Sequence, residues 1–154
     1  MKLFLVQHGD ALAKDIDPDR PLSDRGSADI RRVASFIAPH VDAARVLHSG
    51  KTRAQQTAAL LAEALPGRPA VETLAGIAPN DEVEPIAWQL MDRNENSLLV
   101  GHLPFMARLV AWLLSGSTEN ALVTYHPGSV VCLDSDDHGD WQLQWMIRPE
   151  LLTS

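Results

Sequence analysis

The feature that most constrains the fold is a regular alternation between short apolar runs and longer segments with helical periodicity. Continuous apolar runs over residues 2–7 and 97–101 fit strands that are buried on both faces. Elsewhere, apolar side chains recur at i, i+3, i+4 and i+7, as they do from Ile30 to Ile37. This alternation predicts a mainly parallel sheet with helices on both faces.

The pattern predicts an α/β fold, a three-layer α/β/α sandwich with an antiparallel hairpin at the C-terminal end of the sheet. The chain has no repeat and no linker, so residues 1–154 are expected to form a single domain. The expected strands cover residues 2–7, 44–48, 70–74, 97–101, 129–133 and 141–146, with a turn at 134–140. The expected helices run from the N-cap Ser23 to the residue before Pro39, over residues 52–65, around 83–90 and around 106–113 after Pro104.

Composition narrows the range of partners. The formal net charge is −7, which argues against a surface that binds nucleic acid. The single cysteine, Cys132, cannot form a disulfide within the chain and is expected to be a buried strand thiol. The apolar runs Leu3–Val6 and Leu109–Leu114 are too short for a signal-peptide core and a membrane span, respectively. We therefore expect a cytoplasmic protein with no membrane partner.

Polar residues follow three of the expected strands at the point where each strand ends. His8 follows the first strand, the segment Ser49–Arg53 follows the second, and His102 follows the fourth. Ligands of alternating α/β folds bind beyond the carboxyl ends of the strands. Each of these segments also leads into a turn or a helix N-terminus, whose free backbone amides favour an anion. Two histidines and an arginine at such positions predict a phosphate-binding pocket.

Spacing argues against two other kinds of site. The segment Gly50–Thr52 looks like the end of a P-loop, but the first glycine of that motif would fall at position 45, which is Arg45. The six histidines include no pair with H-x-x-x-H spacing, and the cysteine lies elsewhere in the chain. We therefore expect neither a P-loop nor a metal centre.

Three short motifs carry a resemblance to a known family: Gln7–Gly9, Ser49–Ala58 and Gly101–His102. They resemble the histidine phosphatase (phosphoglycerate mutase-like) superfamily. That family has Arg-His-Gly at the first strand end, Ser-Pro-x-x-Arg-Ala-x-Gln-Thr-Ala at the second, and Gly or Ser before His at the later one. The segments Pro21–Ser23 and Gly101–Pro104, with the compact length, resemble more narrowly the SixA-type phosphohistidine phosphatases.

The resemblance implies a phosphoglycerate mutase-like fold and assigns roles to individual residues. His8 would be the nucleophile that attacks phosphorus, and Arg53 would stabilise the phosphoryl oxygens. His102, if protonated, would add a second cation. No metal and no other cofactor is implied. Substrate-binding positions would be Gln7, Gly9, Asp10 and Ser49, although Asp10 fits a turn-capping role equally well.

Two positions depart from the family pattern. Gln7 stands where the family has its first arginine, and Gly50 stands where it has proline. Loss of a charge-assisted hydrogen bond of about 1.5–3 kcal/mol weakens stabilisation roughly 10- to 150-fold if nothing replaces it. Lys51 and Arg25 are the two cations that we consider as replacements.

The general acid is expected in the segment before the third helix. Asp81 and Glu82 are the candidates there, with helix N-capping as the alternative for both. A phosphate ester needs a proton for its alkoxide leaving group, whereas the P–N bond of phosphohistidine is labile. A weakly placed acid would therefore favour a phosphoramidate substrate.

The expected function is a phosphohistidine phosphatase that acts on a phosphorylated protein in signal transduction. The resemblance implies a partner such as a histidine-phosphotransfer domain and a site that binds the phosphate ion. Two alternatives stay open: a phosphatase of small phosphomonoesters, and a catalytically impaired phosphoprotein-binding module, because of Gln7.

Overall fold

The computed structural model describes residues 1–152 and contains one six-stranded sheet. The strands are β1 (Lys2–Gln7), β2 (Arg45–His48), β3 (Ala70–Thr73), β4 (Ser97–Gly101), β5 (Val130–Ser135) and β6 (Trp141–Ile147). Their order in the sheet is β3-β2-β4-β1-β5-β6. The pairings among β1 to β4 are parallel, and β5 pairs antiparallel with both β1 and β6. The predicted parallel sheet with an antiparallel hairpin at its C-terminal end is therefore confirmed.

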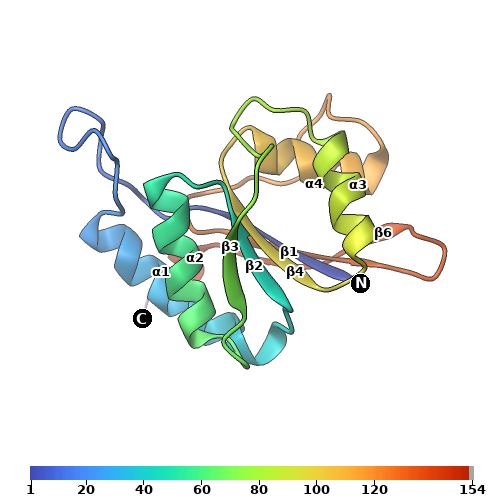
Figure 1. Ribbon diagram of the computed structural model, residues 1–154, viewed down its shortest axis with the longest axis horizontal. Helices are drawn as coiled ribbons and strands as arrows, with labels where there is room; N and C mark the ends of the chain where they lie inside the picture. Colours follow the sequence, from blue (N-terminus) through green and yellow to red (C-terminus); the bar gives the residue numbers. More distant parts are fainter. Residues whose placement is uncertain (153–154) are drawn as a thin grey trace.

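Four α-helices cover the two faces of this sheet. They are α1 (Asp24–Ile37), α2 (Thr52–Ala64), α3 (Glu84–Arg93) and α4 (Phe105–Ser115), with short 3₁₀ helices η1 (Ala38–His40) and η2 (Pro149–Leu152). Figure 1 shows α1 and α2 on one face and α3 and α4 on the other, which gives the predicted three layers. No helix within residues 1–152 has the length and hydropathy needed to cross a bilayer.

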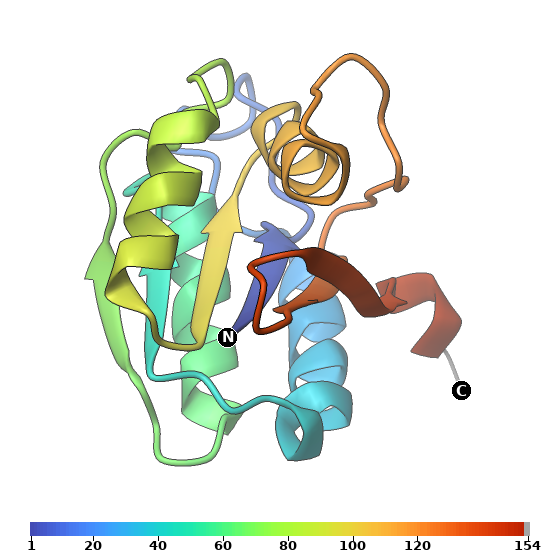
Figure 2. The same ribbon diagram turned by 90° about the vertical axis from the view of Figure 1, so that its right-hand side faces the viewer.

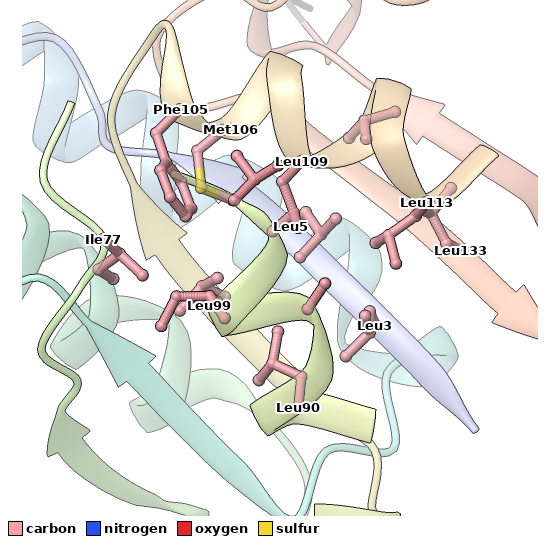
Figure 3. Close-up of a cluster of buried hydrophobic side chains, with 14 of the residues drawn as sticks. Leu3, Leu5, Ile77, Leu90, Leu99, Phe105, Met106, Leu109, Leu113 and Leu133 are labelled. Atoms are coloured by element: carbon pink, nitrogen blue, oxygen red, sulfur yellow. The ribbon is translucent and has the colours of Figure 1, made fainter. Parts of the chain in front are cut away.

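The buried strands contribute side chains to two separate hydrophobic cores, because neighbouring residues of a strand point to opposite faces. Leu3 and Leu5 of β1 pack into the core under α3 and α4, as Figure 3 shows for part of that cluster. Phe4 and Val6 of the same strand pack into the core under α1 and α2. The continuous apolar run of β1 thus reflects burial on both faces.

The C-terminal hairpin differs slightly from its prediction. β5 extends to Ser135, so the turn is shorter than the predicted 134–140. Asp134 and Ser135 stay in the sheet because they pair with β6, and the Ser135 amide also donates to the Met1 carbonyl at 3.0 Å. Cys132 is buried as predicted, and burial raises its pKa to about 11.

The segment between β1 and α1 is irregular but closely tied to the rest of the fold. An isolated antiparallel bridge joins Ala11 to Leu22, and Ser23 Oγ accepts from the Gly26 amide at 2.9 Å, which confirms the predicted N-cap. Gly26 packs so tightly that a Cβ there would lie 2.0 Å from the Asp10 carbonyl oxygen. The first turn of α1 therefore lies directly against the residues that follow His8.

Candidate active site

The parallel strands bring the two predicted histidines together. Gln7 of β1 pairs with Gly101 of β4, so the residues that follow both strands emerge side by side. The His8 amide donates to the Gly101 carbonyl at 3.0 Å, and the rings of His8 and His102 lie 5.0 Å apart between centroids. In Figure 2 the arrowheads of β2 (cyan) and β4 (yellow) point to the same edge of the sheet.

Hydrogen bonding fixes the tautomer of His8. Its Nδ1 lies 2.7 Å from the Gly9 carbonyl oxygen, and because a carbonyl only accepts, Nδ1 carries the proton. Nε2 therefore keeps its lone pair, and it accepts a hydrogen bond from Arg53 Nε at 3.3 Å. Burial lowers the pKa of His8 to about 4, and the nearby charges of Arg53 and Arg20 contribute. His8 is thus a neutral imidazole with an available ring nitrogen at neutral pH.

Thr57 links the turn that follows His8 to the helix that carries Arg53. Its Oγ1 accepts from the Gly9 amide at 3.0 Å and donates to the Arg53 carbonyl at 2.8 Å, one turn earlier in α2. These two bonds give the threonine of the motif a structural role, because they tie the turn after β1 to the first turns of α2. It also gives Gly9 a positioning role, because Gly9 does not line the cavity described below.

His102 is almost fully buried and neutral. Its Nε2 lies 2.6 Å from Ser49 Oγ, so Ser49 contacts the second histidine and does not itself line the cavity. Burial, followed by the charges of His8 and Arg53, lowers the pKa of His102 to about 3. The condition for a second cation, a protonated His102, is therefore not met in this structure. A bound phosphate dianion would oppose this shift by favouring the charged form.

These side chains open onto a cavity of about 290 Å³. Its lining residues are Gln7, His8, Asp10, Ala11, Arg20, Arg53, Pro79, His102, Leu103 and Pro127. The predicted His8, Arg53 and His102 are thus brought to one place, together with Gln7 and Asp10. Arg20 was not predicted, because it lies in a loop without periodicity that tertiary contacts, among them the Ala11–Leu22 bridge, fold back toward the site. Its position directly before Pro21 was the one available signal of a defined turn.

Neither of the replacement cations proposed from the sequence reaches this cavity. Gln7 is buried, and its Oε1 has no hydrogen-bond partner within residues 1–152. Lys51 is exposed and does not line the cavity, although its charge contributes to the lowered pKa of His102. Arg25 lines a separate cavity of about 480 Å³, where it pairs with Asp29 at 3.8 Å.

The candidate acids lie apart from the histidines. Asp81 Oδ2 accepts from the Ala78 amide at 2.8 Å, so this carboxylate is engaged in its own turn. The predicted alternative, N-capping of α3, is wrong, because the N-cap residue is Val83 and no side chain makes a capping hydrogen bond there. Neither Asp81 nor Glu82 lines the cavity, in which Asp10 is the one carboxylate. Asp10 Oδ2 accepts from Ser23 Oγ at 2.7 Å, so Asp10 serves both as a turn partner and as part of the lining. Within residues 1–152, no group of three or more His, Cys, Asp or Glu is placed to hold a metal ion.

Known proteins share both the motifs and the fold. Residues 3–78 match the family model of the histidine phosphatase superfamily (branch 1). Phosphohistidine phosphatase SixA of Escherichia coli (strain K12) is 28% identical over 155 residues, which cover 97% of this chain and 94% of that protein. The chain is similar to the histidine phosphatase superfamily.

Solved structures support the same similarity. The protein histidine phosphatase SixA complexed with tungstate aligns with a TM-score of 0.87 and 26% identity, over 99% of this chain and 100% of that chain. The alpha-ribazole phosphatase from Shigella flexneri aligns with a TM-score of 0.77 over 97% of both chains, and at 19% identity it supports the fold alone. The predicted SixA-type resemblance and the phosphoglycerate mutase-like fold are confirmed.

The lowered pKa values of the two active-site histidines can be tested by NMR. We expect the ring protons of His8 and His102 to keep the shifts of neutral imidazole from about pH 8 to about pH 5. Both midpoints should lie lower, near 4 for His8 and near 3 for His102, because burial opposes the charged form. His8→Ala and His102→Ala assign the signals. A midpoint above about pH 6 for either ring, close to that of a free imidazole, would contradict this description of the site.

Proposed function

We propose that this chain is a histidine phosphatase that hydrolyses phosphohistidine on a protein through a covalent intermediate at His8. The observation that carries the proposal is the tautomer of His8, whose Nδ1 is tied to the Gly9 carbonyl while Nε2 keeps its lone pair at the cavity. A neutral, oriented imidazole is what nucleophilic attack on phosphorus requires. The lowered pKa of His8 keeps it in this form at neutral pH.

The proposed reaction has two displacements at phosphorus. In the first, the Nε2 lone pair of His8 forms a P–N bond while the P–N bond of the substrate breaks. The released imidazole keeps that electron pair and takes a proton from solvent. In the second, water attacks phosphorus, the bond to Nε2 breaks, and orthophosphate leaves. The net reaction consumes one water molecule and requires neither an oxidant nor a reductant.

Arg53 is suited to hold the phosphoryl group during both steps. Its Nε donates to His8 Nε2 at 3.3 Å, which places the guanidinium beside the attacking atom. The terminal nitrogens of the same side chain can form parallel hydrogen bonds to two phosphoryl oxygens. Phosphoryl transfer depends mainly on such positioning and charge stabilisation, so we assign Arg53 as a catalytic residue.

The carboxylates near the site favour a P–N substrate over an ester. Asp81 is engaged in its own turn, and Asp10, the carboxylate in the lining, accepts from Ser23 Oγ. A site with so few candidate acids supports a leaving group that is readily protonated from solvent, as imidazole is. The likeness to proteins described as SixA phosphohistidine phosphatases supports the same substrate class. A protein substrate, a cytoplasmic location and a role in signalling belong to this proposal.

A comparison of substrates tests the proposed chemistry. We expect kcat/KM for a phosphohistidine peptide and for phosphoramidate to exceed that for phosphoserine by about 100-fold, since its alkoxide leaving group needs an acid that the site does not position. Both P–N substrates should also exceed p-nitrophenyl phosphate, an ester whose leaving group needs no acid. Steady-state phosphate release measures all four under one buffer. A preference for the esters would overturn the P–N assignment and point instead to a phosphatase of small phosphomonoesters.

Gln7 favours a second candidate function, a phosphoprotein-binding module without turnover. A buried amide replaces the arginine of the family motif, so the site lacks one of its expected charges. The binding module would bind phosphate and phosphoprotein but would never form a bond to His8. Covalent labelling of His8, described in the Discussion, separates the two functions.

A further inference from the structure

We propose that Arg20 supplies the phosphate-binding positive charge that Gln7 cannot. The anion in question is the phosphoryl group of the proposed reaction, so this inference rests on the proposed function and adds a substrate-binding residue to it. Arg20 is one of ten residues that line the cavity, together with Gln7, His8 and Arg53. It is the lining cation that the family motifs do not include.

Arg20 is close enough to the catalytic groups to alter their electrostatics. Its charge contributes to the lowered pKa of His8, of Arg53 and of His102. After burial, the charge of Arg20 is the main cause of the lowered pKa of Arg53, because the two guanidinium groups repel each other across the cavity. A dianion between them would convert this repulsion into two attractions. Neither arginine forms an ion pair with a carboxylate of residues 1–152.

The loop holds Arg20 in a defined orientation. Its Nε donates to the Leu12 carbonyl at 3.0 Å, and its backbone amide donates to the Asp17 carbonyl at 3.0 Å. The Nε contact uses one of the five N–H groups of the guanidinium, so the two terminal nitrogens keep four donors for another acceptor. Such a fork presents two parallel donors to a phosphoryl group.

The backbone at Arg20 adopts a conformation that non-glycine residues rarely use. Its φ is 49°, in the left-handed region, and the next residue is Pro21, whose ring further restricts the residue before it. Strain of this kind persists where the surrounding structure imposes it, and it is concentrated at functional sites. Here the Ala11–Leu22 bridge and the hydrogen bond from the Leu22 amide to Gln56 Oε1 at 2.7 Å impose it.

Exchanging the charge between positions 20 and 7 tests the proposal. We expect Arg20→Gln to weaken the binding of orthophosphate, and to lower kcat/KM, by roughly 10- to 150-fold, the effect of one lost charge-assisted hydrogen bond. Gln7→Arg alone should raise kcat/KM less than about 3-fold, because Arg20 already occupies that part of the cavity. In the Arg20→Gln background, Gln7→Arg should restore about 10-fold or more.

Two further variants separate charge from folding. Arg20→Lys keeps the charge but loses the fork, so it should retain more phosphate affinity than Arg20→Gln, whereas a purely structural role through the Leu12 carbonyl would weaken both equally. Arg31→Gln removes an exposed charge from α1 and should leave phosphate affinity within about 2-fold. Phosphate and tungstate affinities are measured by calorimetry, which does not require turnover.

The possible outcomes distinguish this inference from the proposed function. If phosphate affinity depends on Arg20 but no variant hydrolyses any substrate, Arg20 binds the anion and the proposed enzymatic function fails. If hydrolysis proceeds and Arg20→Gln changes neither affinity nor kcat/KM by more than about 2-fold, the role of Arg20 is overturned and the enzymatic function stands. Failure of Gln7→Arg to restore the Arg20→Gln protein would also overturn it, because the lost charge would not be the cause.

Discussion

Replacement of His8 by alanine is expected to lower kcat by about 10⁴-fold or more, since it removes the atom that forms the proposed intermediate. His8 combines three properties in one ring: an Nδ1 proton tied to the Gly9 carbonyl, an available Nε2, and a pKa lowered to about 4. His102 is the other histidine of the cavity lining, and its one hydrogen bond does not fix its tautomer, because Ser49 Oγ can donate to Nε2 or accept from it. Steady-state phosphate release measures the loss.

Covalent labelling shows whether His8 carries the phosphoryl group. The protein is reacted with radiolabelled phosphoramidate and then quenched rapidly without acid. The unmodified protein should carry label, and the His8→Ala protein should carry none. His138→Ala, a change at an exposed position in the hairpin turn, is the matched control and should label normally. Label that persists in His8→Ala would place the nucleophile elsewhere. Phosphate binding without label on either protein would favour the binding module.

Replacement of Arg53 by glutamine is expected to lower kcat/KM by about 10²–10³-fold, because phosphoryl transfer depends on the charge of such an arginine. The change also removes the Nε contact to His8 Nε2, so a glutamine cannot position the ring from the same helix turn. Burial lowers the pKa of Arg53, yet its side chain stays cationic at neutral pH and is half-buried against the cavity. Initial rates with phosphoramidate measure this effect.

A matched arginine change shows that the loss is local. Arg108→Gln removes an exposed charge from α4 and should leave kcat/KM within about 2-fold. The thermal unfolding midpoint of each variant excludes a loss of fold as the cause. A change below about 5-fold for Arg53→Gln would contradict its assignment as a catalytic residue.

The fold could be predicted because its strands and helices are strongly periodic. The run of β1 is buried on both faces, and the apolar side chains from Ile30 to Ile37 lie in the same core as one face of that strand. Each apolar pattern in the sequence therefore corresponds to side chains buried in a core. The ends of β1, β2 and β4 also determined where His8, Arg53 and His102 meet, since parallel strands end at one edge. Both inferences depend on regular structure, where spacing in sequence converts directly into direction in space.

The residues that escaped prediction lie in irregular segments or depend on burial. Arg20 reaches the cavity because a bridge closes its loop, which no periodicity indicates. Asp81 is turned toward the Ala78 amide by a local hydrogen bond that competes with any role in the cavity. The protonation of His102 depends on how deeply its ring is buried, and the neighbouring residues in the sequence do not reveal this depth.

The hydroxyl of Thr57 joins two parts of the site. Because the Gly9 amide and the Arg53 carbonyl share this one side chain, we expect the turn that carries His8 and the helix that carries Arg53 to move together. The loop around Arg20 is attached to these parts through other contacts, at Leu12, Leu22 and Gln56. We therefore expect motion of this loop to change the opening of the cavity more than it changes the contact between Arg53 Nε and His8 Nε2, so that substrate can enter without disturbing that contact.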